Sequence, residues 1–212
     1  MKLAVFGASG RTGRLVVEQA LALGHDVTAI VRDPRKLGLR HPGLRVRTAD
    51  VTDPAELVRL LGGQDAAIST LGANNNKTAG IASAAVRAIL TALPTTSCDR
   101  FVAVSAVPVE PAGRCERLLV RAAVTPLLRT VLREVYADLA LMEQQLRRSN
   151  GVRWTVVRPP RLLNRPFTGS YRRRVGGNVP RGTGISRADL ACALLAVLTD
   201  TATMRQVVGV SR

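Results

Sequence analysis

Three glycines, Gly7, Gly10 and Gly13, follow a short apolar run near the start of the chain and precede a helical pattern. A glycine-rich turn between a strand and a helix lets backbone approach a pyrophosphate and aims the helix amides at the anion. The spacing differs from the usual Gly-x-Gly-x-x-Gly, so position is the stronger signal. The turn predicts a dinucleotide site rather than its alternative, an ordinary strand-to-helix connection. The predicted cofactor contacts here are Gly7, Ser9, Gly10, Arg11, Thr12 and Gly13.

The second predicted strand ends in Val31-Arg32-Asp33, beside the expected place of the adenosine ribose. An acid there typically holds the 2′-hydroxyl of NAD, whereas an arginine suits the 2′-phosphate of NADP. Arg32 follows Gly13 by about 20 residues, the expected separation. We therefore predict that Arg32 and Arg11 bind the phosphate of NADP(H). Were Asp33 to turn inward instead, NAD(H) would be preferred.

The segments that must position these residues alternate between strand and helix. Predicted strands cover 2–6, 26–31, 44–48, 65–69, 100–105, 154–158 and 206–210. Predicted helices run from the glycine turn to 23, from 53 to 61, 79 to 93, 131 to 148 and 186 to 198, and a loop covers about 164–184. This alternation is typical of the α/β class, here a single Rossmann-type doubly wound parallel sheet with helices on both faces. We expect one domain over 1–212, with a substrate pocket built from loops at about 158–186.

The chain carries a formal net charge of +16, which would suit a nucleic-acid partner. However, nearly all of its basic residues are arginines, and they are spread from Arg11 to Arg212. An aromatic content of 3% also leaves few rings for base stacking. The run Tyr171-Arg172-Arg173-Arg174 is the strongest local case, and its alternative interpretation is a solvated loop. These features argue against nucleic-acid binding.

Other residue classes point to no metal or membrane function. Cys98, Cys115 and Cys192 lack the paired spacing of zinc ligands or a redox motif, so we predict inert thiols. His25 and His41 fall in predicted loops outside the pocket, and no metal site is expected. No apolar run reaches the roughly 18 residues of a membrane span, and the N-terminus lacks the pattern of a signal peptide. We therefore expect a cytoplasmic protein.

Six short motifs carry a family resemblance that runs nearly the whole chain. They are GASGRTG at 7–13, Val31-Arg32-Asp33, Asp50-Val51, Leu71-Gly72-Ala73, Pro159-Pro160-Arg161 and Thr168-Gly169-Ser170-Tyr171. In this order they resemble the atypical short-chain dehydrogenase/reductases, closest to the flavin reductase/biliverdin-IXβ reductase group and the NmrA-like proteins. The motifs are specific for the fold and the cofactor, and they do not specify a substrate.

The resemblance implies a role for each motif. Asp50 and Val51 would flank the adenine, and Leu71, Gly72 and Ala73 would line the ribose and pyrophosphate. Ser105, Ala106 and Pro159 would approach the nicotinamide, which makes Ser105 a weak catalytic candidate. Val107, Arg161 and Tyr171 would face the substrate.

The catalytic end departs from the usual pattern. Typical short-chain dehydrogenases use a Tyr-x-x-x-Lys pair to protonate a carbonyl oxygen, but Tyr136 is followed four residues later by Ala140. Ala106 also stands where flavin reductase-like members often carry serine. An acceptor that delocalises the incoming charge can take its proton from water, and it then needs positioning more than an acid. Arg161 could hold an anionic acceptor, although an ordinary surface arginine is an equal alternative.

Two functions remain. The first is an NADPH-dependent oxidoreductase that transfers hydride to a planar, electron-poor small molecule, such as a flavin, a tetrapyrrole or a quinone. The alternative is a non-catalytic NADP(H)-binding redox sensor of the NmrA-like type. The missing dyad is compatible with both.

Overall fold

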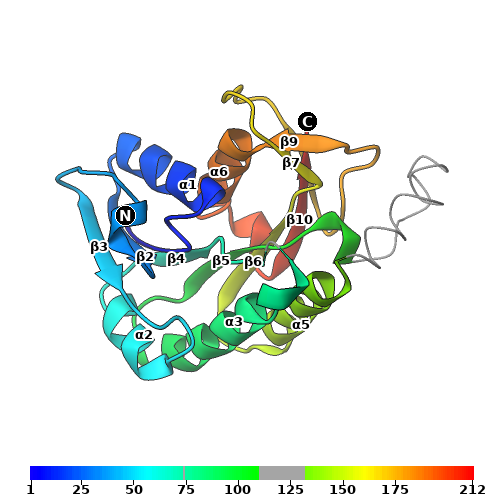
Figure 1. Ribbon diagram of the computed structural model, residues 1–212. Coiled ribbons are helices and arrows are strands. Elements are labelled where there is room, and N and C mark those ends of the chain that lie inside the picture. Colours follow the sequence, from blue (N-terminus) through cyan, green and yellow to red (C-terminus); the bar gives the residue numbers. More distant parts are fainter. Residues whose placement is uncertain (74, 110–131) are drawn as a thin grey trace.

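The computed structural model describes residues 1–73, 75–109 and 132–212. Its centre is an eight-stranded sheet in the order β3-β2-β1-β4-β5-β6-β10-β8, seen from one edge in Figure 1. The strands are β1 (Lys2–Phe6), β2 (Asp26–Val31), β3 (Leu44–Thr48), β4 (Ala66–Ser69), β5 (Arg100–Val104), β6 (Arg153–Arg158), β8 (Arg172–Val175) and β10 (Gln206–Ser211). All paired neighbours are parallel except β8, which runs antiparallel to β10.

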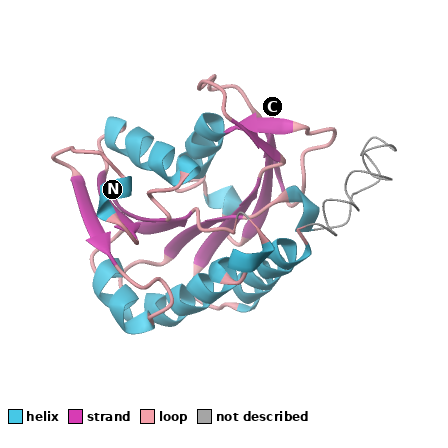
Figure 2. Ribbon diagram, viewed as in Figure 1, coloured by secondary structure: helices cyan, strands magenta, loops and turns pink. Residues whose placement is uncertain are grey.

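Helices cover both faces of the sheet (Figures 1 and 2). One face carries α1 (Arg11–Ala22) and α6 (Arg187–Ala196), and the other carries α2 (Pro54–Leu61), α3 (Ile81–Ala92) and α5 (Arg133–Arg148). Successive strand side chains point to opposite faces, so Leu3 and Val5 pack in one core cluster and Ala4 and Phe6 in the other. This two-faced burial explains why the central strands read as unbroken apolar runs.

The predicted α/β class and parallel doubly wound sheet are confirmed, as are the first six strands and the last one. The loop predicted over 164–184 is wrong in part, because it contains β8 and leads into β9 (Gly184–Ser186), which pairs with β7 (Arg161–Leu163). All four residues of β8 are exposed and show no apolar alternation, so its pairing with β10, not its own pattern, makes it a strand. Cys115 and Val131 lie outside the described residues.

Buried Arg100, the first residue of β5, joins the sheet to the end of α6. Its Nε donates to the carbonyl of Leu198 at 3.0 Å, and its Nη2 donates to Val197 O at 2.6 Å and Thr155 Oγ1 at 2.7 Å. Burial lowers the pKa of Arg100 to about 10. Nearby Cys98 is fully buried, and burial raises the pKa of its thiol to about 12, as expected of an inert core cysteine.

No helix in the described ranges is both long and apolar enough to cross a bilayer.

Candidate functional site

The site lies where the connections leave the sheet on opposite faces. The turn after β1 leads to α1 on one face, whereas the segment after the adjacent β4 leads to α3 on the other. In an open parallel sheet, this switch point creates a crevice outside the carboxyl ends of the strands, where ligands bind. The glycine turn and the predicted ribose segment, Leu71 to Ala73, follow the two strands that flank it.

The glycine turn has the geometry of a phosphate cradle. Gly7 has a φ of +73°, which favours glycine, and its carbonyl accepts a hydrogen bond from Gly10 N at 2.9 Å. A Cβ on Gly13 would lie 2.2 Å from that carbonyl, so the close approach of α1 to the turn requires glycine. A Cβ on Gly10 would meet Gly7 O at 3.1 Å. The carbonyl of Gly7 therefore fills the inside of the turn, and Gly10 is its exposed residue.

Thr70 links the segment after β4 to the end of β1, and sequence reasoning did not predict this contact. Its backbone N–H and its hydroxyl both donate to the carbonyl of Phe6, at 3.1 and 3.0 Å. A Cβ on Gly7 would lie 2.9 Å from Thr70 Oγ1. The end of β4 thus packs directly on the turn and leaves space for no larger residue at position 7.

The N-terminus of α1 is left open to a ligand. Its N-cap is Gly10, no side chain caps it, and its first turn holds no acid. Among the α-helices of the described ranges, α3 begins in the same way at Gly80, whereas Asp53 caps α2, Ser186 caps α6, and α5 carries Glu134 in its first turn. Open amides and a positive dipole end are what a pyrophosphate requires.

The N-terminus of α3 shows the contrast. Asp138 reaches across from α5, and its carboxylate accepts hydrogen bonds from Ala82 N at 3.1 Å and Ser83 N at 2.9 Å. This carboxylate occupies the anion position at that helix end. The residues of the glycine turn therefore fit a dinucleotide phosphate, and α3 contributes no competing site.

At the expected ribose end, Arg32 directly follows β2 and is exposed. The carboxylate of Asp33 is already hydrogen-bonded to Arg35. Its Oδ1 accepts hydrogen bonds from Arg35 N at 3.1 Å and Arg35 Nε at 3.0 Å, and these bonds lower the pKa of Asp33. At the end of β2, the first side chain is therefore the exposed Arg32, and the carboxylate of Asp33 is already bound to Arg35.

Asp50 and Val51 follow β3, on the same edge of the sheet. Asp50 Oδ1 accepts hydrogen bonds from the hydroxyl of Thr52 at 2.6 Å and its backbone N–H at 2.8 Å, which lower the pKa of Asp50. Glu56 accepts from Asp50 N at 2.7 Å, and Val51 is buried. These contacts fix the loop at the predicted adenine position.

The predicted nicotinamide segments follow the adjacent strands β5 and β6. Their pairing continues beyond the strand ends, because Ser105 N donates to Val157 O at 2.9 Å and Val107 N to Pro159 O at 3.1 Å. Ser105 is only 4% exposed, whereas Ala106 and Val107 are half-buried. These two bonds keep the segment after β5 paired with the segment after β6, and we call Ser105, Ala106 and Val107 the floor of the candidate site.

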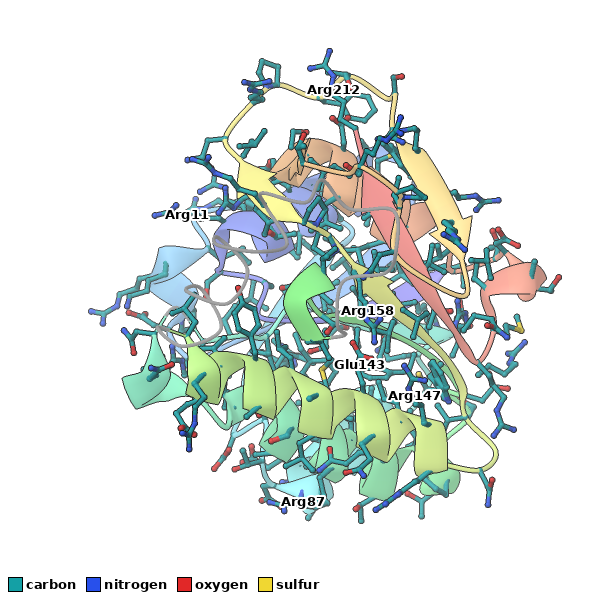
Figure 3. The ribbon with its side chains drawn as sticks, turned by 90° about the vertical axis from the view of Figure 1, so that its right-hand side faces the viewer. Arg11, Arg87, Glu143, Arg147, Arg158 and Arg212 are labelled. Carbon is teal, nitrogen blue, oxygen red and sulfur yellow. The ribbon has the colours of Figure 1, made fainter. Side chains whose placement is uncertain are left out.

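Beneath this floor lies a cluster that sequence reasoning missed. Ser105 Oγ donates to Glu143 Oε1 at 2.6 Å, and Arg158 Nε donates to the same oxygen at 2.8 Å. Arg158 Nη2 donates to Glu143 Oε2. Figure 3 shows Glu143 from α5 and Arg158 from β6 side by side at the centre of the molecule. The available signal was an acid on the apolar stripe of α5, between Leu139 and Leu146.

Tyr136 lies on α5 two helical turns before Glu143, and it packs against the core cluster that includes Phe101. The position four residues after it, which would carry the lysine of a typical dyad, is Ala140, and this alanine is exposed. Tyr136 therefore has a place in the fold as a partly buried core side chain.

The C-terminal loops are anchored to α6. Ser186 caps this helix by accepting a hydrogen bond from Asp189 N at 2.9 Å. The carboxylate of Asp189 accepts from Thr168 N at 2.9 Å and Gly169 N at 3.0 Å. Burial alone would raise the pKa of Asp189, but these bonds, with those from the hydroxyls of Ser186 and Thr168, lower it. The Thr168–Gly169 motif thus serves to hold its loop on the helix.

The three predicted substrate residues lie on different elements and differ in exposure. Arg161 begins β7 and is exposed, and Val107 lies on the floor described above. Tyr171 is half-buried against the α1–α6 face of the core, where burial and the neighbouring Cys192 raise the pKa of its hydroxyl to about 12.

Arg187 is a further arginine at the start of α6, and its guanidinium donates to Asn164 at 2.5 Å. Burial lowers the pKa of Arg187, and the nearby charge of Arg11 adds to this effect.

Comparisons with known proteins agree with this geometry. The chain is 29% identical over 189 residues to an uncharacterized chloroplastic protein of Arabidopsis thaliana, a match that covers 80% of this chain. The chain spans only 62% of that protein's length. A solved structure from Streptococcus pneumoniae, assigned provisionally as an NADH-flavin reductase, is 26% identical with a TM-score of 0.78, covering 100% of this chain and 99% of that one.

A short-chain dehydrogenase/reductase of Veillonella parvula, solved in complex with NADP, has a TM-score of 0.80 at 17% identity, over 100% of this chain and 94% of that one. At this identity the likeness establishes the fold alone. The model of a family described as NAD(P)H-binding matches residues 7–201, from the first glycine of the turn to beyond α6. The chain therefore belongs to the NAD(P)H-binding family, as the resemblance to atypical short-chain dehydrogenase/reductases predicts.

Proposed function

We propose that this protein is an NADPH-dependent reductase that transfers hydride to a planar, electron-poor acceptor, such as a flavin, a tetrapyrrole or a quinone. The observation that carries the proposal is the contrast between the two ends of the crevice. At one end, the open N-terminus of α1 suits a pyrophosphate. At the other, the hydroxyl hydrogen of Ser105 is already committed to Glu143. The site therefore suits dinucleotide binding, but Ser105 is not placed to protonate a carbonyl.

The residues that would hold the cofactor follow from this arrangement. The glycine turn and the first amides of α1 would bind the pyrophosphate, and Arg32 with Arg11 would bind the 2′-phosphate. The pairing of Asp33 with Arg35 favours NADPH over NADH, because the carboxylate that could hold a ribose 2′-hydroxyl is engaged elsewhere. When bound, the reduced nicotinamide supplies the hydride.

The acceptor would lie over Ala106 and Val107, in a pocket completed by the loops at about 158–186 of the same domain. Arg161 is exposed at the start of β7, where it can pair with a phosphate or carboxylate of the acceptor. Tyr171 would contribute from the α6 side. An acceptor that spreads the incoming charge over a ring system takes its proton from water, so the pocket needs chiefly to align the two rings and exclude water from between them.

The relatives support this direction. The Streptococcus pneumoniae protein, provisionally an NADH-flavin reductase, resembles this chain along its whole length, and the Veillonella parvula enzyme binds NADP in the same fold. The proposal extends the reduction of a flavin from the first and the use of NADP from the second to this chain.

The test is NADPH oxidation with a panel of flavins, quinones and linear tetrapyrroles, beside a titration of NADPH and NADH binding. We expect tight NADPH binding and turnover with at least one planar acceptor, but none with simple ketones. Binding without turnover across the panel would contradict the enzymatic proposal and favour the redox-sensor alternative. Absence of nucleotide binding would contradict both.

A further inference from the structure

The cluster of Ser105, Glu143 and Arg158 holds two opposite charges out of water. The side chain of Glu143 is 3% exposed and that of Arg158 is 1% exposed. The hydroxyl of Ser105 and the Nε and Nη2 of Arg158 occupy both carboxylate oxygens. Arg147, one turn further along α5, adds a longer contact of 3.4 Å to Oε2; Figure 3 shows it beside the pair.

A buried ion pair such as Glu143–Arg158 is expected to add little to the stability of the fold. Desolvation of two charges offsets most of their attraction, and apolar residues of similar volume often replace a buried pair without loss of stability. Arg100, the other fully buried arginine among the described residues, braces the opposite edge of the sheet with carbonyl and hydroxyl partners and no carboxylate. A carboxylate is therefore not needed to bury an arginine in this fold, and the position of Glu143 calls for another explanation.

That position is at the candidate site. Ser105 follows the carboxyl end of β5 and Arg158 ends β6, so the single side chain of Glu143 joins the two strand ends. Their backbones are also paired on either side of this link, through Val157 and Pro159. The carboxylate thus holds the floor of the crevice to the long helix α5 from below.

The link also determines the polarity of Ser105. A serine has one hydroxyl hydrogen, and a carboxylate can only accept, so this hydrogen points to Glu143. The remaining lone pairs of Ser105 can accept a hydrogen bond and cannot donate one. Any group that Ser105 holds must therefore be an N–H or O–H donor.

We infer that Glu143 is a positioning residue for the nicotinamide end of this site: through Ser105 and Arg158 it fixes the ends of β5 and β6 and keeps Ser105 an acceptor-only contact. The inference rests on the proposed placement of the cofactor. It assigns Glu143 no contact with the reacting atoms. It predicts that loss of the carboxylate loosens the nicotinamide ring while the phosphates at the glycine turn stay bound.

The test compares Glu143→Gln with the intact protein by three measurements on bound NADPH. The dissociation constant should stay within about threefold, because most of the affinity comes from the phosphate end. The fluorescence anisotropy of the bound nicotinamide should fall. With an acceptor that the wild type reduces, kcat should drop roughly 10- to 100-fold, the cost of a small misplacement of reacting groups.

Two further variants separate positioning from stability. Arg100→Met removes a buried arginine at the far end of β5, so it should lower Tm while leaving the anisotropy of bound NADPH and kcat per folded molecule unchanged. The double variant Glu143→Met/Arg158→Met replaces both charges by apolar side chains, so it should regain thermal stability relative to Glu143→Gln. Because the link to Ser105 is still missing, its bound nicotinamide should remain mobile.

Wild-type anisotropy and kcat in the folded double variant would overturn the inference, since the pair would then be a stability element only. Ser105→Ala keeps the ion pair and removes one link to it, so it checks the same point in a variant that retains the buried charges. It should also lower the anisotropy, and unchanged anisotropy would overturn the role given to Ser105. If the wild type binds NADPH but reduces no acceptor, the proposed reductase function fails, while the anisotropy still decides the role of Glu143.

Discussion

Asp33 Oδ1 lies 3.1 Å from the backbone N of Arg35 and 3.0 Å from its Nε, so one carboxylate oxygen caps the turn after β2 and binds the arginine two residues on. The acid that would mark an NAD-binding chain is present in the sequence but is engaged with its neighbour. Arg32, one residue earlier, is the exposed group at the strand end. The choice of cofactor is therefore expected to depend on these three side chains.

We expect the protein to bind NADPH more tightly than NADH, and Arg32→Ala to remove most of the difference. A charge-assisted contact to the 2′-phosphate contributes about 1.5–3 kcal/mol, or more than tenfold in affinity. Titration of both nucleotides against the two proteins measures this. Arg59→Ala is the matched control, because Arg59 is an exposed arginine in the last turn of α2.

Equal dissociation constants for NADPH and NADH in the wild type would show that Arg32 does not read the phosphate. Arg35→Ala gives a second check of the same assignment. It removes the side-chain hydrogen bonds to Asp33 and keeps the backbone one, so the carboxylate is more available and NADH affinity should rise relative to NADPH affinity.

Gly10→Val should abolish dinucleotide binding and leave a folded protein. The φ of Gly10 is −75°, which any residue can adopt, so the fold tolerates a side chain better here than at Gly7 or Gly13. The branched side chain would stand where the pyrophosphate must approach. Gly62→Val, at the end of α2 where a Cβ makes ordinary contacts, is the control. Normal NADPH binding by folded Gly10→Val would mean that the turn is only a connection.

Tyr136→Phe should keep the reduction of a flavin or similar acceptor within about tenfold of wild type. Loss of a true general acid normally costs ~10²–10⁴ in rate, and Ala140 stands where an activating lysine would be. Steady-state kinetics with NADPH and a working acceptor measure the effect. A collapse of kcat with KM unchanged would restore the carbonyl-reductase mechanism, with a proton relay that works without its lysine.

The Asp189 carboxylate should stabilise the folded protein only above acidic pH. Its pKa is lowered in the fold, so its contribution is present above the unfolded value of about 3.9 and is lost as the pH falls through the folded value. Asp189→Asn should therefore cost about 1–3 kcal/mol at pH 7 and less at pH 3, where the unfolded carboxyl is mostly protonated. Thermal unfolding across this range measures it, with the exposed pair residue Glu18→Gln as control. An equal loss of stability at both pH values would contradict this account.

Much of the fold could be predicted because its signals are local. The apolar run at β2 is buried on nearly every residue, and Asp53 and Ser186 begin helices that their side chains do cap. By contrast, β8 has no local signal: every residue of Arg172–Val175 is exposed, and only the register with β10 makes the segment a strand. A strand whose stability comes entirely from its partner cannot be recognised from its own residues.

The same division applies to the site. The glycine turn and Arg32 could be proposed as site residues from the sequence because each directly follows a strand. Glu143 acts on Ser105 from 38 positions away, and Asp138 caps a helix that begins more than 50 positions earlier. Such contacts are decided by how α5 packs across the sheet. Their one local trace is that both acids lie on the buried stripe of α5, where an unpaired charge would be costly.

Arg100 has a consequence for how the chain is made. It lies near the middle of the sequence, and besides the carbonyl of Arg153 it binds those of Val197 and Leu198, 97 and 98 residues later. At roughly 5–20 residues per second, these partners follow on the ribosome about 5–20 s after the arginine. Until then part of the guanidinium must remain hydrated, because Arg153 and Thr155 bind only some of its donors and burial of an unpartnered donor is costly. The amino end of β5 therefore reaches its final packing only after α6 has been synthesised and has docked on the sheet.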